Sequence, residues 1–266
     1  MNEWGPALAV ILGIVEGLTE FLPVSSTGHL IVAGHLAGFT GAKAATFEVF
    51  IQAGAILAVA ILERRRMVGL LRPSPRGGFA GLRGCLLLAI TSAPALVVGW
   101  LLHDWIKQTL FGPVTVAWAL GLGGLAILAA ERWRPEPRVT DVDGIGWRGA
   151  LQVGLFQVLA LWPGVSRSGA TIVGGLCSGL DRRTAATYSF LAAIPVMGAA
   201  TAYDLLKAWP ALGAADVVPF AIGFGVSFLA AWAAVRTFIA LLGRWTLRPF
   251  AWYRIAVAPI ILLVVA

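Results

Sequence analysis

Long apolar runs recur along the chain. Four of them contain no charged residue, and two more contain only one each, Glu48 or Arg254. A helix needs about 20 mostly apolar residues to cross the hydrocarbon core of a bilayer. The pattern therefore predicts six transmembrane helices, at residues 44–62, 84–102, 108–130, 184–203, 217–235 and 249–266.

Two further apolar segments, residues 4–42 and 148–180, do not fit as simple spans. Proline, serine and glycine interrupt each near its middle, in FLPVSSTGHL at residues 21–30 and in PGVSRSGAT at residues 163–171. Apolar runs of about 10–14 residues suit re-entrant segments, and irregular backbone at membrane depth is tolerated only inside protein or beside water. We therefore predict two re-entrant helical hairpins, each of which enters the membrane and returns to the same side.

The two predicted hairpins are also similar in sequence. With an offset of 141 positions and no gap, the coinciding pairs include Gly13 and Gly154, Ser25 and Ser166, Gly28 and Gly169, and Gly38 and Gly179. This register indicates a duplication within a single integral membrane domain, residues 1–266. Repeat 1 covers about residues 1–133 and repeat 2 about residues 145–266, each with one hairpin and three spans. Because three is odd, repeat 2 is inverted in the membrane, as in many transporters.

The composition agrees with an all-α polytopic membrane protein. Hydrophobic residues make up 59% of the chain and charged residues only 12%, with a mean hydropathy of +0.85, whereas soluble domains have about 25% charged residues. The net charge of +7 comes mostly from arginines clustered beside the spans, the last cluster being Arg236 to Arg254. The positive-inside rule places these clusters in the cytoplasm and both termini outside. We expect no nucleic-acid partner, and no signal peptide, because the N-terminal segment has no basic stretch and carries Glu3.

Two carboxylates precede the interruption of the first hairpin. Glu16 and Glu20 are four residues apart, so they lie on one helix face. Carboxylates inside a membrane are costly unless they are paired, metal-bound or solvated. Two together favour a divalent cation, with Mg²⁺ or Ca²⁺ as the natural choice for oxygen ligands. The alternative is that they pair with Arg167 or face a polar crevice.

Hydroxyl groups and an imidazole follow these carboxylates. Ser25, Ser26 and Thr27 precede Gly28 and His29. One hydroxyl could serve only to cap the following helix, but three in a row exceed what a cap needs. His29 is a candidate nucleophile or proton donor because imidazole titrates near neutrality; the alternative is a structural histidine.

The interruption of the second hairpin has the composition of an anion cradle. Glycines allow a sharp turn, a helix starting near Ser168 would present free N–H groups, and Arg167 carries a permanent planar charge suited to phosphate. The alternative is a structural turn with an arginine that reaches for the membrane surface. The candidate anion-binding residues are Gly164, Ser166, Arg167, Ser168, Gly169 and Thr171.

An anion cradle, a candidate nucleophile and two carboxylates inside a bilayer favour a phosphorylated lipid as substrate. At these residues the chain resembles the undecaprenyl-diphosphatase family, which is also known for bacitracin resistance. EGLTEFLPVSSTGH matches its first motif, PGVSRSGAT matches its second, and the resemblance covers the full length.

The resemblance implies hydrolysis of undecaprenyl diphosphate to undecaprenyl phosphate and inorganic phosphate, with a divalent cation, Mg²⁺ or Ca²⁺. It implies the bacterial inner membrane, with the active site open to the outside. Glu20, Ser26, His29 and Arg167 are then catalytic, and Glu16 and Glu20 hold the metal. By the resemblance Ser25, Ser166, Ser168 and Thr171 are functional positions too. We expect these four residues, together with Thr27, Gly164 and Gly169, to bind the substrate phosphates.

The sequence leaves open whether Ser26 or His29 attacks phosphorus. We favour Ser26, with Glu20 and His29 as its acid–base partners. A rival function is a transporter or flippase of phosphorylated lipid carrier, which the inverted repeat would suit equally well. The oligomeric state is open too, with a homodimer as the candidate assembly.

Overall fold

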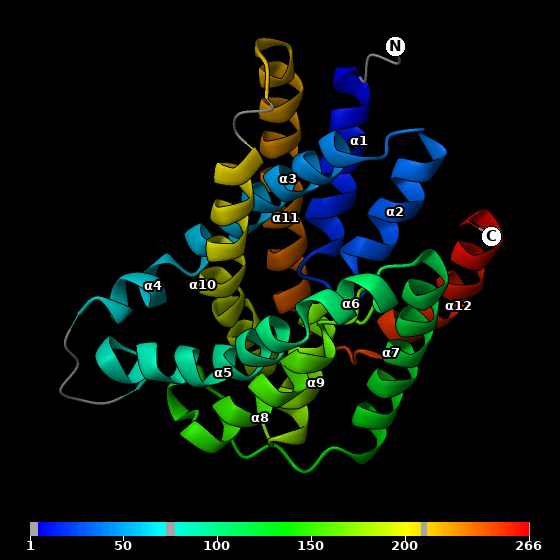
Figure 1. The fold of residues 1–266 in the computed structure, drawn as a ribbon. Helices are drawn as coiled ribbons and strands as arrows, with labels where there is room; N and C mark the ends of the chain where they lie inside the picture. Colours follow the sequence, from blue (N-terminus) through cyan, green and yellow to red (C-terminus); the bar gives the residue numbers. More distant parts are fainter. Residues whose placement is uncertain (1–4, 73–77, 209–211, 266) are drawn as a thin grey trace.

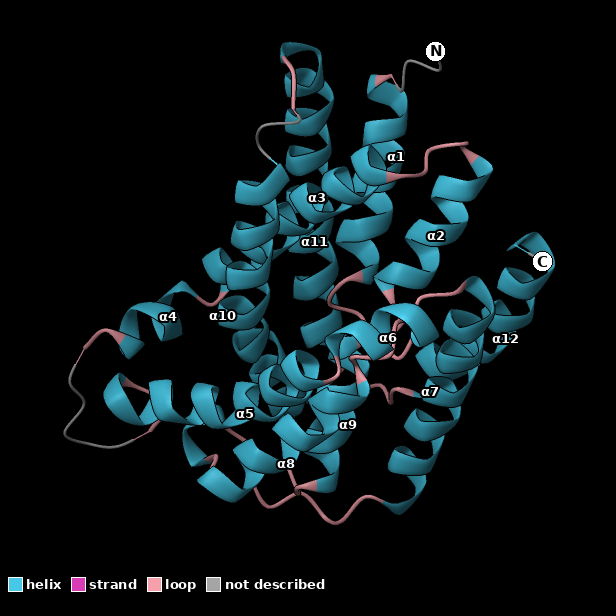
Figure 2. Cartoon of the chain, in the orientation of Figure 1, coloured by secondary structure: helices cyan, strands magenta, loops and turns pink. Residues whose placement is uncertain are grey.

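The computed structural model describes residues 5–72, 78–208 and 212–265. Residues 4 and 266, at the ends of the first predicted hairpin and the last predicted span, lie outside these ranges. Within them every regular element is a helix (Figure 2), and one isolated β-bridge joins Val139 and Leu180. The helices are α1 Pro6–Thr19, α2 Ser26–Leu36, α3 Ala42–Leu62, α4 Arg64–Leu70, α5 Gly81–Leu101, α6 His103–Leu110, α7 Pro113–Trp133, η1 Val142–Gly144, α8 Trp147–Leu159, α9 Arg167–Cys177, α10 Arg182–Ala208, η3 Ala214–Asp216, α11 Val217–Leu241 and α12 Arg248–Val265.

Five helical segments are long and apolar enough to cross a membrane, by length and composition: α3, α5, α7, α10 and residues 214–241. The chain is therefore an integral membrane protein with several apolar helices. The sixth predicted span forms α12, which does not meet the same criterion among the described residues. The predicted span 108–130 began too early, because residues 103–110 form the separate helix α6 and Pro113 starts α7. Proline fits the first turn of a helix, where its missing N–H is no loss.

Both interrupted segments are helical hairpins, as their sequences predicted. α1 and α2 contact each other, as do α8 and α9. Their breaks fall at corresponding positions, since α2 begins at Ser26 and α9 at Arg167. Ser25 and Ser166 precede these helices with φ angles of 70° and 72°, and they are the two described non-glycine residues with positive φ. A non-glycine residue there is strained by about 1–3 kcal/mol, so the surrounding structure must hold both turns in place.

Each hairpin packs its first helix against a span that lies far away in sequence. α1 contacts α11, and α8 contacts α5; Figure 1 shows the first pair in the upper part of the view and the second in the lower part. A Cβ atom at Gly13 of α1 would lie 2.7 Å from the Gly223 carbonyl oxygen. A Cβ atom at Gly154 of α8 would lie 2.6 Å from that of Thr91. Both glycines are therefore required because any side chain would keep the two helix backbones apart. Small residues allow the same close approach between helices in membranes.

Candidate active site

A cavity of about 190 Å³ lies where the turns of the two hairpins meet. The first turn supplies a carboxylate and three hydroxyl residues, and the second supplies a guanidinium group. α3 and α10 complete the wall. The lining residues are Glu20, Ser25, Ser26, Thr27, Gln52, Ala160, Trp162, Pro163, Gly164, Ser166, Arg167 and Met197. Seven of them are residues that the sequence predicted as catalytic or phosphate-binding.

Glu20 connects the two hairpins. It follows the last residue of α1 and is 7% exposed. Its Oε2 accepts a hydrogen bond of 2.5 Å from the Ser26 hydroxyl, and its Oε1 accepts one of 3.1 Å from Nη2 of Arg167. Glu20 thus pairs with Arg167, which was one of the partners that the sequence offered for the acidic pair. A buried charged hydrogen bond of this kind depends on both partners, because the survivor of a deletion is left buried and uncompensated.

Arg167 is held by its own hairpin and by α10. Its Nη1 donates to the backbone oxygen of Ser189 at 3.2 Å. The Ser189 hydroxyl is 2.6 Å from that of Thr171, which also donates to the Arg167 backbone oxygen at 2.8 Å. The Arg167 guanidinium carbon lies 5.2 Å from the centre of the Phe21 ring, a cation–π arrangement. These contacts hold the Arg167 side chain in the cavity wall.

Three residues predicted to bind phosphate lie behind the cavity wall rather than in it. Ser168 and Thr171 are fully buried. The Ser168 hydroxyl donates to the Leu22 backbone oxygen at 2.9 Å, tying the second turn to the first. The backbone N–H of Gly169 donates to the Ser166 hydroxyl at 3.1 Å, which caps α9. In this structure Ser168, Gly169 and Thr171 therefore act as scaffold for Arg167.

His29 also lies outside the cavity lining. Its Nδ1 is 2.7 Å from the Ser25 backbone oxygen, and its Nε2 is 2.6 Å from the Tyr253 hydroxyl. The two rings are parallel, with centroids 5.6 Å apart. Neither ring nitrogen contacts Ser26, so His29 positions the strained turn in this structure. Tyr253 was missed by sequence reasoning, because nothing local relates it to a residue over 200 positions earlier.

Arg254 is a second functional residue that the sequence analysis misplaced. We assigned it to the last cytoplasmic arginine cluster, but it is 0% exposed in α12. Its guanidinium donates to the Pro23 carbonyl of the first turn at 3.2 Å and to the Gly164 and Val165 carbonyls of the second at 3.0 and 2.8 Å. It also donates to two carbonyls of α7. The available signal was its position inside an apolar run, where an arginine must find partners.

Gln52 was missed as well. It lines the cavity from α3, and its Oε1 accepts a hydrogen bond of 3.2 Å from the Thr201 hydroxyl of α10. A polar amide inside a predicted apolar span was a signal that Gln52 has a polar partner. The sequence of α3 does not indicate which helix supplies that partner.

The predicted metal residues fit a cation in one respect. Oε1 of Glu16 is buried and has no hydrogen-bond partner, and the side chain is only 1% exposed. It interacts electrostatically with Glu20 and Arg167. No group of three or more acidic, histidine or cysteine side chains gathers among the described residues. Of the two predicted metal residues, Glu20 lines the active-site cavity and Glu16 does not.

The fold and the site together define an integral membrane protein in which two helical hairpins enclose a pocket of carboxylate, hydroxyl and guanidinium groups. The family model described as bacitracin resistance protein BacA matches residues 9–260. The chain belongs to this family, which confirms the resemblance noted in its two motifs.

Curated relatives agree over nearly the whole chain. A protein named undecaprenyl-diphosphatase from Maridesulfovibrio salexigens is 60% identical over 254 residues, 96% of each chain. One of the same name from Oleidesulfovibrio alaskensis is 57% identical over 96% of this chain and 97% of its own. A third, from Solidesulfovibrio magneticus, is 51% identical over 94% of both.

Proposed function

We propose that this protein hydrolyses undecaprenyl diphosphate to undecaprenyl phosphate and inorganic phosphate. The reaction recycles the lipid carrier on which peptidoglycan and other envelope polymers are built. Family membership and the names of the relatives support this activity. The observation that carries it is the arrangement of Ser26, Glu20 and Arg167 on one cavity, because a hydroxyl bound to a carboxylate and facing a fixed cation suits phosphoryl transfer.

The geometry supports Ser26 as the nucleophile. The Ser26 hydroxyl passes its proton to Glu20 Oε2, to which it is already hydrogen-bonded. The oxygen then bonds to the terminal phosphorus, while the bond from that phosphorus to the bridging oxygen breaks and undecaprenyl phosphate leaves. Glu20 then gives this proton to the departing undecaprenyl phosphate. Water attacks the phosphoserine and loses a proton to Glu20, the bond between phosphorus and Ser26 Oγ breaks, and Oγ takes the proton back from Glu20 as inorganic phosphate leaves. Arg167 holds the equatorial phosphate oxygens, where charge must be stabilised.

His29 is the weaker candidate nucleophile, since both of its ring nitrogens have partners. Its proposed acid–base role requires Nε2 to exchange the Tyr253 hydroxyl for a substrate oxygen or water. Mass spectrometry of protein quenched during turnover distinguishes the two mechanisms. Phosphate on Ser26 supports this one, and phosphate on His29 overturns it.

We also propose that Glu16 and Glu20 hold Mg²⁺ or Ca²⁺ together with substrate phosphate oxygens. The unpaired buried oxygen of Glu16 supports this assignment. When bound, the cation supplies positive charge to the diphosphate. Direct binding of Mn²⁺, followed by its paramagnetic signal, tests the site without activity; the Glu16→Gln variant should lose the bound ion.

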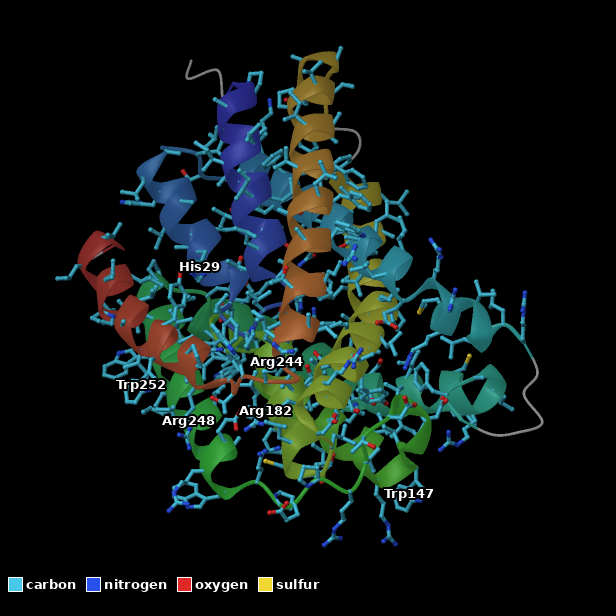
Figure 3. All side chains as sticks on the ribbon, turned by 180° about the vertical axis from the view of Figure 1, so that it is seen from behind. His29, Trp147, Arg182, Arg244, Arg248 and Trp252 are labelled. Atoms are coloured by element: carbon cyan, nitrogen blue, oxygen red, sulfur yellow. The ribbon has the colours of Figure 1, made fainter. Side chains whose placement is uncertain are left out.

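For the arrangement in the membrane, we propose six spans, with α12 as the sixth, and two re-entrant hairpins in inverted repeats. Matching hairpin bounds, the matching φ angles of Ser25 and Ser166, and the α1–α11 and α8–α5 contacts support it. The labelled arginines Arg182, Arg244 and Arg248 lie together below His29 in Figure 3.

This arrangement predicts which side of the inner membrane the site faces. The arginines belong on the cytoplasmic side, so the active site opens to the outside. A cysteine introduced at the exposed Ala42 should react with an impermeant maleimide from the periplasmic side only. The homodimer stays a prediction.

Phosphate release by purified protein tests the function. Wild type should release phosphate from undecaprenyl diphosphate in Mg²⁺ or Ca²⁺ and lose activity in chelator. Glu20→Ala and Arg167→Ala should both be inactive while binding substrate weakly or not at all. A well-folded wild type that binds the lipid but releases no phosphate would instead favour the transporter.

A further inference from the structure

Three cavities adjoin one another through shared wall residues. The candidate active-site cavity shares Thr27, Ala160 and Pro163 with a second cavity of about 630 Å³. That second cavity shares Leu96 and Ala200 with a third of about 780 Å³. The series therefore leads from the Glu20–Arg167 pair to the outer surface of α5 and α10.

The chemistry of the walls changes along this series. The active-site cavity is polar, as described above. The second cavity has apolar walls from α5 together with His103 and Lys107 of α6. The third cavity is a groove between α4, α5 and α10, in which α5 contacts each of the other two helices (Figure 1), and apolar side chains make up most of its lining. Its polar Ser92 hydroxyl donates to the Leu88 carbonyl of its own helix.

We propose that the third cavity, which we call the prenyl groove, is the subsite for the isoprenoid chain of the substrate. This inference rests on the proposed function and extends it to the lipid chain. The diphosphate lies in the active-site cavity, the first isoprene units cross the second cavity, and the following units lie in the prenyl groove. His103 and Lys107 attract the anionic headgroup as it passes toward Arg167.

The prenyl groove is connected to the active-site cavity through the second cavity, and this connection favours the substrate chain over an ordinary membrane lipid as its occupant. A molecule in the groove that also reaches Arg167 must join a long apolar chain to a phosphorylated end. Bilayer chains are as apolar as the groove, so binding gains come from close packing rather than from leaving water. The groove should therefore affect KM for long chains and leave the chemical step unchanged.

Ala200 offers a sharp test, because it lies at the junction of the second cavity and the prenyl groove and is exposed. Ala200→Trp fills the junction without disturbing the protein interior. Ala202→Trp is the matched control: it is exposed on the same helix, two residues further, and lines none of the three cavities. Two residues turn a helix by about 200°, so the control side chain points away from the groove.

Phosphate release should be measured in lipid nanodiscs with undecaprenyl diphosphate and with farnesyl diphosphate, which has the same headgroup and a short chain. Ala200→Trp should raise KM for the long substrate about tenfold and leave farnesyl diphosphate within about twofold. Ala202→Trp should change neither. Equal effects on both substrates, or no effect on the long one, overturn the proposal.

A second measurement separates this inference from the proposed function. Undecaprenyl phosphate carrying a photoreactive group near the end of its chain should label residues 85–96 and 194–200, and excess unlabelled undecaprenyl phosphate should compete. Labelling spread over other lipid-facing helices, or competition by phosphatidylglycerol, overturns the prenyl groove. Groove labelling by a wild type that hydrolyses neither substrate would retain the groove and overturn the phosphatase.

Discussion

Ser25 and Ser166 occupy the same place in the two hairpins and have nearly the same φ angle, 70° and 72°. Their side chains are used differently. The Ser166 hydroxyl accepts a hydrogen bond from the Gly169 N–H and caps α9, whereas the Ser25 hydroxyl makes no cap with α2. Both line the cavity.

The polar groups around the two turns differ in the same way. In the second hairpin, Ser166, Ser168 and Thr171 are hydrogen-bonded to one another or to nearby backbone. In the first, Ser26 is bound to a carboxylate and borders open space. The same backbone turn thus holds Arg167 in one hairpin and, in the other, presents to the cavity the hydroxyl that we propose as nucleophile. The difference lies in which hydroxyl groups are left available by the scaffold.

Removing one hydroxyl from each hairpin should show the largest contrast. Ser26→Ala deletes the proposed nucleophile, so kcat/KM should fall by more than about 10³-fold. Ser168→Ala deletes two hydrogen bonds, to the Leu22 carbonyl and to the Ser166 hydroxyl, each worth roughly 1 kcal/mol, and no proposed reacting group, so the loss should stay within about thirtyfold. Initial rates of phosphate release measure both. Comparable losses would mean that the second hairpin also takes part in the chemistry.

Arg254 joins the two turns, so its removal should disturb both at once. Arg254→Met leaves five carbonyls, four of them in buried hydrogen bonds, without this donor, and unfolding free energy should fall by at least about 3 kcal/mol. Arg248→Met, at the exposed start of the same helix, is the control and should change little. Thermal unfolding in detergent provides the comparison. A variant at position 254 as stable as wild type would contradict the joining role.

The cap on α9 predicts an unequal effect at the two equivalent serines. Ser166→Ala loses the bond to the Gly169 N–H and should cost about 1 kcal/mol of stability. Ser25→Ala loses no cap and keeps the same backbone strain, so it should cost less. Unfolding midpoints of the two variants, measured side by side, check this order, and the reverse order would be inconsistent with the capping difference.

Strain at the first turn predicts the smallest effect. Ser25→Gly relieves a positive φ that costs about 1–3 kcal/mol, but glycine adds freedom to the unfolded chain worth about 0.5–1 kcal/mol. A net gain of about 0.5 kcal/mol is expected from chemical or thermal unfolding. A clear loss of stability would show that the Ser25 hydroxyl itself supports the turn.

Local pattern was sufficient to predict the hairpins and the residues at their tips. In the first hairpin the helix break follows a carboxylate and contains a run of hydroxyl residues, and in the second the break contains an isolated arginine; these local features allowed Glu20, Ser26 and Arg167 to be selected in advance. Local pattern could not predict the partners that distant helices supply. Tyr253 and Gln52 reach the site only because α12 and α3 pack where they do, and nothing in their own segments specifies that. Arg254 was visible as a charge in an apolar run, but its role depends on carbonyls more than 80 residues away.

The position of Arg254 has a consequence for biosynthesis. Helices α1 to α11 leave the ribosome before α12, so a nascent chain that already contains Glu20, Ser26 and Arg167 still lacks the cation that joins their two turns. The two turns therefore gain this shared hydrogen-bond donor only when the last helix of the chain, α12, docks against α7.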